Sequence, residues 1–90
     1  MPATMQAITG PDGHLSNLRP FVGSSMSAQW TPEGCYIVYS YGTPIAWHAN
    51  GETFHNTHRY SNTTSKHQSA CREWLAFRST VLAELSELAS

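Results

Sequence analysis

The sequence predicts a small α+β domain in which an antiparallel three-stranded β-meander packs against one long C-terminal α-helix. Residues 35–41, CYIVYSY, are dense in aromatic and β-branched residues, which is typical of a strand. Asn50-Gly51 separates two further strand-like runs, and this dipeptide favours a two-residue type I′ turn because both central positions need a positive φ. Beyond the sheet, apolar residues recur at helical spacing up to the last residues of the chain.

The three strands are expected at residues 35–41, 44–49 and 52–60, after a turn at TPEG, residues 31–34. A two-residue loop at Asn50-Gly51 pairs Trp47 with Phe54 across the second hairpin. Ile45 shares their side of the strand, so we expect these apolar residues to form the core face. A first hairpin turning at Gly42-Thr43 would set Val38 opposite Trp47.

The opposite side of the second hairpin is polar and is expected to face water, as one side of a small antiparallel sheet often does. Three of its side chains are candidates for binding a partner because they carry imidazole or guanidinium groups. The residues of this predicted polar face are His48, Thr53, His55, Thr57 and Arg59, and the three candidates are His48, His55 and Arg59.

A helix is expected over residues 66–88, opened by a capping box at Ser65-x-x-Gln68. Its apolar stripe is Cys71, Trp74, Leu75, Val81, Leu82, Leu85 and Leu88. Such a helix would be about 33 Å long at 1.5 Å per residue. A three-stranded sheet cannot cover a stripe of that length, so the sequence predicts a homodimer through the C-terminal helix.

Residues 1–27 are expected to be a flexible or loosely packed arm, followed by a single domain over residues 28–90. The arm contains GPDGHLSNLRPFVGSSM, which is rich in glycine and proline and has no sustained period. A single helical turn near Leu15 and Leu18 is the alternative, limited by Pro20.

Composition excludes some classes of protein. Charged residues make up 12% of the chain and the net charge is −1, which gives no long-range attraction to phosphate or anionic lipid. No apolar run reaches the ~20 residues of a membrane span, and no export signal precedes the domain, so we expect an intracellular protein. Cys35 and Cys71 are expected to be free thiols.

The stretch RYSNTTSKHQSAC, residues 59–71, concentrates hydroxyl groups just before the predicted helix. Such groups are favoured there because they cap free backbone N–H groups. With Lys66 and His67 they could instead form an anion-binding lip at the first turn. The two interpretations stay open, and the candidate binding residues are Tyr60, Ser61, Thr63, Thr64, Ser65, Lys66, His67 and Gln68.

Neither a metal centre nor a catalytic site is indicated, and no cofactor is expected. His55 and His58 would point to opposite sides of a regular strand, and zinc needs three or four converging ligands. No phosphate-binding loop or hydrolase motif is present in the sequence. Metal-free RNA cleavage by Tyr60, Lys66 and His67 is the one catalytic alternative, and it rests only on their proximity in sequence.

Residues 39–69, YSYGTPIAWHANGETFHNTHRYSNTTSKHQS, resemble a pattern in short bacteriophage proteins of unknown function, notably those of phages that infect actinobacteria such as mycobacteria. The shared elements are Tyr39 to Ala46, Asn56, and Tyr60 to Gln68. The resemblance implies a phage origin and a place in the cytoplasm of the infected bacterial host, and it implies no activity.

Together these observations predict a non-enzymatic phage accessory protein that acts as a protein–protein interaction module. Its expected partner is a host protein, bound through the helix or through the polar face of the sheet. The alternative is a small nucleic-acid-binding or RNA-cleaving protein that uses the corner between strand and helix, Tyr60 to Gln68.

Overall fold

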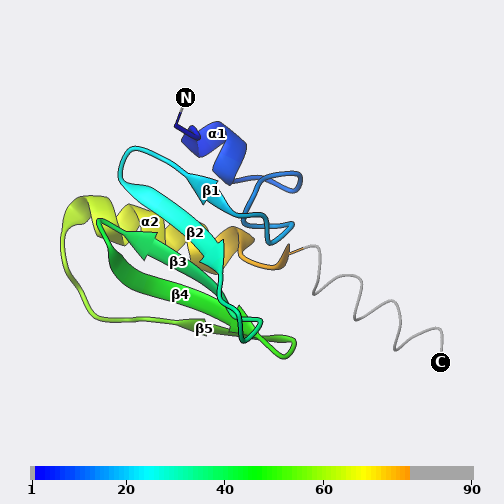
Figure 1. The fold of residues 1–90 in the computed structure, drawn as a ribbon. Coiled ribbons are helices and arrows are strands. Elements are labelled where there is room, and N and C mark those ends of the chain that lie inside the picture. Colours follow the sequence, from blue (N-terminus) through cyan, green and yellow to red (C-terminus); the bar gives the residue numbers. More distant parts are fainter. Residues whose placement is uncertain (1, 78–90) are drawn as a thin grey trace.

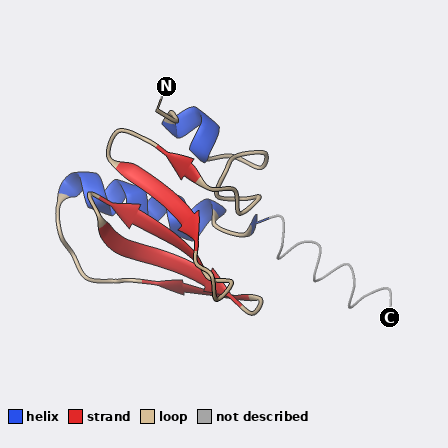
Figure 2. Ribbon diagram, viewed as in Figure 1, coloured by secondary structure: helices blue, strands red, loops and turns tan. Residues whose placement is uncertain are grey.

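The computed structural model describes residues 2–77 of the chain. Five strands form one antiparallel sheet in the order β1-β2-β3-β4-β5, and helix α2 lies across one of its faces (Figure 1). Figure 2 shows the resulting two layers, strands in front and helix behind. The elements are α1 (Met5–Ile8), β1 (Phe21–Val22), β2 (Met26–Trp30), β3 (Tyr36–Ser40), β4 (Thr43–Ala49), β5 (Glu52–His55) and α2 (Asn62–Trp74). The predicted α+β class is confirmed, with five strands in the meander instead of three.

The second hairpin has the predicted register. Trp47 pairs with Phe54, and the strands turn through Asn50 and Gly51, whose φ values are 54° and 78°. A type I′ turn needs these two left-handed residues. A dipeptide of local sequence therefore fixes how β4 and β5 meet.

The first hairpin turns one residue earlier than predicted. Tyr41 and Gly42 take the left-handed conformation, with φ values of 51° and 81°. The register then shifts between Val38 and Tyr39, and Val38 pairs with Ala46. The predicted pairing of Val38 with Trp47 is wrong because neither the earlier turn nor this irregularity has a clear sequence signal.

Residues 2–27 differ from the predicted flexible or loosely packed arm. They supply α1, β1 and part of β2, and β1 pairs with β2 through Phe21 and Ala28. Leu15 is fully buried, and its carbonyl accepts the N–H of Ala76 at 2.9 Å. The glycines here permit close packing: a Cβ on Gly13 would lie 2.2 Å from the Thr9 carbonyl oxygen.

Helix α2 begins at Asn62, earlier than the predicted residue 66, and ends at Trp74. Its N-cap is Ser61, whose Oγ accepts the Thr64 N–H at 3.1 Å, so the predicted capping box at Ser65 and Gln68 is wrong. Leu75 follows in an extended conformation, and the chain thus leaves the helix well before the predicted end at residue 88. The predicted stripe residues Val81, Leu82, Leu85 and Leu88, and with them most of the predicted dimer surface, lie outside the described residues.

The core lies between α2 and the sheet. Tyr36, Val38 and Ala46 point toward the helix and are completely buried. Ala70 and Cys71 meet them from α2, and burial raises the pKa of the Cys71 thiol to about 12. Both cysteines are free, as the sequence predicts.

Candidate functional site

Ile45 is buried in the core as predicted, but the rest of the second hairpin has its two sides the reverse of the prediction. His48 and His55 lie on the side that α2 covers, and His48 is only 8% exposed. The His48 Nδ1 atom is 2.9 Å from Thr53 Oγ1, so these two groups satisfy each other inside the protein. Of the predicted water-facing polar face, His48 is buried and Thr53 and His55 are half-buried, while Thr57 and Arg59 are exposed beyond the end of β5.

Burial sets the charge of these histidines. It lowers the pKa of His48, and it lowers that of His55 with a smaller contribution from the nearby Arg72. His55 Nδ1 is enclosed without a hydrogen-bond partner among residues 2–77. No three His, Cys, Asp or Glu side chains of that range gather closely enough to hold a metal ion.

The predicted corner residues divide between the inside and the surface. Thr64, His67 and Gln68 point inward and are 4%, 6% and 5% exposed. Ser65 is half-buried, and the other four are exposed to solvent: Tyr60, Ser61, Thr63 and Lys66. His67 is thus buried while Lys66 is exposed, and RNA cleavage by these residues stays a prediction.

Gln68 holds the connection between β5 and α2. Its Nε2 donates to the carbonyl oxygens of Asn56 at 2.7 Å and His58 at 2.9 Å. Asn56 Nδ2 donates in turn to the Pro44 carbonyl and to the Tyr60 hydroxyl. These bonds replace the predicted last residues of the third strand with a fixed loop, so Asn56 and Gln68 have an architectural role.

Four polar side chains form a continuous hydrogen-bonded chain from the surface into the core. Ser61 Oγ donates to Thr64 Oγ1 at 3.2 Å, which leaves the Thr64 hydroxyl hydrogen for Ser40 Oγ at 3.0 Å. Ser40 Oγ in turn lies 2.7 Å from His67 Nδ1, a bond in which either group can donate. The direction that lets every hydroxyl both donate and accept is the one with Ser40 donating, and it requires the proton of neutral His67 on Nε2.

The close contact of Ser40 with His67 has the composition of a nucleophile beside a base. Ser40 is 1% exposed, however, so a substrate cannot reach its hydroxyl. Burial also lowers the pKa of His67, which keeps the ring neutral. The contact therefore anchors α2 to the sheet. Sequence reasoning missed Ser40, although a serine within an otherwise aromatic and β-branched strand was a usable signal.

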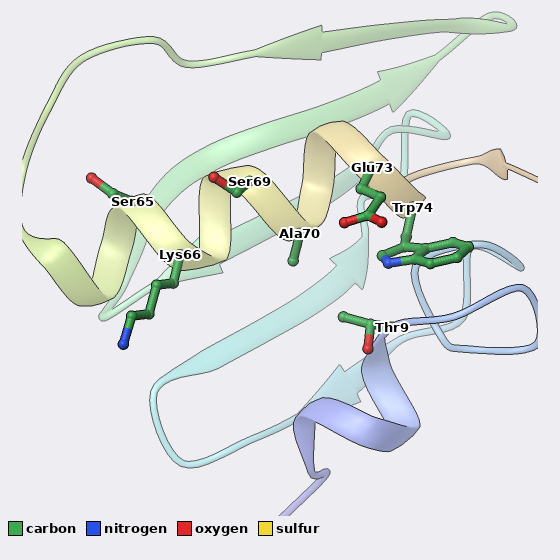
Figure 3. A pocket seen from close by; sticks show the side chains of 7 residues that line it. All are labelled: Thr9, Ser65, Lys66, Ser69, Ala70, Glu73 and Trp74. Carbon is green, nitrogen blue, oxygen red and sulfur yellow. The ribbon is translucent and has the colours of Figure 1, made fainter.

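A groove of about 430 Å³ runs between α2 and the end of α1 (Figure 3). Lys66 lies at one end, Glu73 and Trp74 lie at the other, and Thr9 faces Trp74 across it. The groove is shallow, and the exposed charged side chains of Lys66 and Glu73 lie at its two ends.

The other face of the sheet carries an apolar row that crosses three strands. Ile37 pairs with Trp47, and Trp47 pairs with Phe54, so all three side chains share one side. The Trp47 and Phe54 rings are stacked with centroids 6.2 Å apart, and Phe54 is 42% exposed. We call this row, Ile37, Trp47 and Phe54, the open sheet face, because within residues 2–77 no helix covers it (Figure 1).

Comparison with known proteins places the chain in a family. A family model matches residues 14–80, well over half of the sequence. The chain belongs to DUF8033, a family of unknown function. The match spans β1 to α2 and therefore includes the whole sheet, the buried hydroxyl–imidazole chain and the open sheet face. No curated protein and no solved structure matches the chain.

Within the part of the chain that the structure describes, no helix is both long and apolar enough to cross a membrane. On the open sheet face, Phe54 is exposed while Ile37 and Trp47 are half-buried. Trp47 and Phe54 are the two residues of this row that the sequence predicts to lie in the core.

Proposed function

We propose that this DUF8033 protein is a non-enzymatic protein-interaction module that binds a protein partner through the open sheet face. The observation that carries this proposal is the apolar row Ile37–Trp47–Phe54 on an uncovered side of the sheet. Contiguous apolar surface of this kind marks interaction sites in soluble proteins. Tryptophan and tyrosine dominate the binding energy of protein interfaces, and Trp47 lies at the centre of the row.

The surroundings of the row resemble an interface in composition. Polar residues border it, with Gln29 beside Ile37 and Glu52 near Phe54 on the same side of the sheet. An apolar centre with a polar rim is the usual anatomy of a protein interface. The side chains also stand on paired strands and are fixed before binding, which lowers the entropic cost of association.

The expected partner is a host protein, and the expected setting is the cytoplasm of an infected actinobacterial cell. The resemblance of residues 39–69 to bacteriophage proteins supports this source. A second copy of the chain is the competing occupant of the same face, since a symmetric pair would also bury the row. Nucleic acid is disfavoured by the net charge of −1.

The test is an affinity capture from actinobacterial lysate with tagged wild-type protein, with Trp47→Ser and with Phe54→Ser. Phe77→Ser is the matched control, because Phe77 is also 42% exposed but lies beyond the end of α2. We expect a protein that is retained by wild type and by Phe77→Ser to be lost from both variants of the open sheet face. Circular dichroism and thermal unfolding must show that all variants remain folded.

Other results would redirect the proposal. Equal retention by all variants would contradict a binding role for the open sheet face. Loss of all retained material after nuclease treatment would favour the alternative, nucleic-acid binding by the corner Tyr60 to Gln68. Light scattering on purified wild type, compared with Trp47→Ser, would reveal self-association if a second copy occupies the face.

A further inference from the structure

A second site lies on the other side of the sheet, where His67 meets the N-terminal residues. A pocket of about 210 Å³ opens there between residues 2–8, the connection from β1 to β2, and α2. His67 is the one residue of α2 that lines it. The other lining residues are Pro2, Ala3, Thr4, Met5, Ile8, Gly23, Ser24, Ser25 and Met26.

The His67 ring is almost fully buried and has one free polar atom. Its Nδ1 is occupied by the Ser40 hydroxyl at 2.7 Å, and Nε2 has no hydrogen-bond partner among the described residues. The one fully enclosed side-chain atom of that range without a partner is His55 Nδ1, so His67 Nε2 is open to the pocket and not sealed in the core. A chain of hydroxyls in which Ser61, Thr64 and Ser40 each donate toward the core would leave the ring proton on this atom.

The lining defines the chemistry of a ligand. None of the pocket residues carries a fixed charge, and Met5, Ile8 and Met26 provide an apolar wall. A charged ligand would lose its hydration there without gaining a counter-charge. The volume exceeds the roughly 150 Å³ of a cavity that holds benzene, so a single substituted ring fits.

We propose that this pocket binds a small uncharged ring compound through its carbonyl oxygen, which accepts a hydrogen bond from His67 Nε2–H. Met5, Ile8 and Met26 contact the ring, and the buried hydroxyls hold the imidazole in the donating tautomer. This site is independent of the open sheet face and goes beyond the proposed function.

Nuclear magnetic resonance of the full chain tests both parts of the proposal. A long-range proton–nitrogen spectrum of the imidazole rings should show His67 protonated on Nε2. Titration with acetophenone should shift the signals of Met5, Ile8, Met26 and His67 in a saturable manner. The matched probe is α-methylstyrene, which has the same shape but carries a CH₂ group in place of the carbonyl oxygen.

We expect α-methylstyrene to bind about ten-fold more weakly, as the loss of one hydrogen bond predicts. His67→Phe should bring the affinity for acetophenone down to that for α-methylstyrene. The comparison of the two probes uses wild-type protein and so does not depend on the folding of this variant. Equal affinities, a proton on Nδ1, or the absence of saturable shifts at the pocket would each overturn the proposal.

Discussion

The two sides of the sheet are built from alternate residues of the same strands, yet they differ in kind. On β3, Tyr36 is buried under α2 while its neighbour Ile37 lies on the open sheet face. On β4, the polar His48 is buried while the aromatic Trp47 is half-exposed. The imidazole of His48 is therefore more deeply buried than the indole of Trp47.

The difference shows that a side chain of this sheet is buried where it finds packing or hydrogen-bond partners, and that its polarity alone does not decide its burial. The covered side offers hydrogen bonds to its polar groups, such as Thr53 for His48 and His67 for Ser40. A satisfied polar group is tolerated in a core. On the open sheet face the apolar side chains have only one another, which leaves them available to a second protein.

The largest expected effect is a difference in stability between substitutions at two adjacent residues of β3. Tyr36→Ala should lower the free energy of unfolding by about 3–5 kcal/mol, because it removes a fully buried ring and leaves a cavity. Ile37→Ala on the open sheet face should lower it by about 1 kcal/mol or less. Urea unfolding of both variants measures the two values.

If Tyr36→Ala does not fold, a milder variant can be compared with Ile37→Ala instead. Tyr36→Phe keeps the ring and loses only the 2.6 Å bond from the hydroxyl to the Arg19 carbonyl, so it should cost about 1 kcal/mol. Equal losses for Tyr36→Ala and Ile37→Ala would show that both sides of the sheet are covered in solution.

The second expected effect is that the free energy of unfolding depends on pH, because of the histidines on the side of the sheet that α2 covers. His48, His55 and His67 all have pKa values lowered from 6.5, chiefly by burial. Near and below pH 6.5 the unfolded chain therefore binds more protons than the native protein. Stability is fully present above about pH 6.5 and is lost as the pH falls, by at most about 1.4 kcal/mol per pH unit for each histidine.

Urea unfolding between pH 7.5 and 5.5 measures this slope. His48→Gln should reduce it, because one titrating group is removed from the covered side. A free energy of unfolding that is constant over this range, or that rises toward acid pH, would show that these imidazoles are not buried in the neutral form.

The smallest effect concerns the open sheet face itself. Phe54→Ala should change the free energy of unfolding by about 1 kcal/mol, since it removes a cross-strand pair with Trp47 from a side chain that is 42% exposed. Thermal unfolding beside wild type checks this. A loss comparable to that of Tyr36→Ala would mean that Phe54 is packed against something in the isolated protein.

Much of the fold could be predicted because some signals are local. Asn50-Gly51 determines the second turn and thereby the pairing of Trp47 with Phe54. The N-terminal part could not be predicted in the same way, because Leu15 and Phe21 are buried by contacts with strands and a helix that lie far along the chain. A segment rich in glycine and proline gives no periodic pattern even when it packs tightly, as Gly13 does against Thr9.

The candidate sites were harder to predict than the fold. The sequence singled out the corner Tyr60 to Gln68 as one group, but its residues separate because a helix directs successive side chains around its axis. Ser40 and His67 lie 27 positions apart and meet only because α2 crosses β3. The pocket beside His67 also needs residues 2–8, and no local pattern in that segment predicts its position there.

By itself, the sequence determined the α+β class, the second hairpin with its register, and a helix after the sheet, because turn chemistry and periodicity act between near neighbours. Only the tertiary structure decided which side of the sheet is inside. The alternation of side chains along a strand defines two sides of the sheet but does not determine which of them is buried. That is determined by where α2 packs and by which polar side chains it can provide with hydrogen bonds. The same docking buries His48, leaves Trp47 on the uncovered side and brings His67 to the N-terminal pocket.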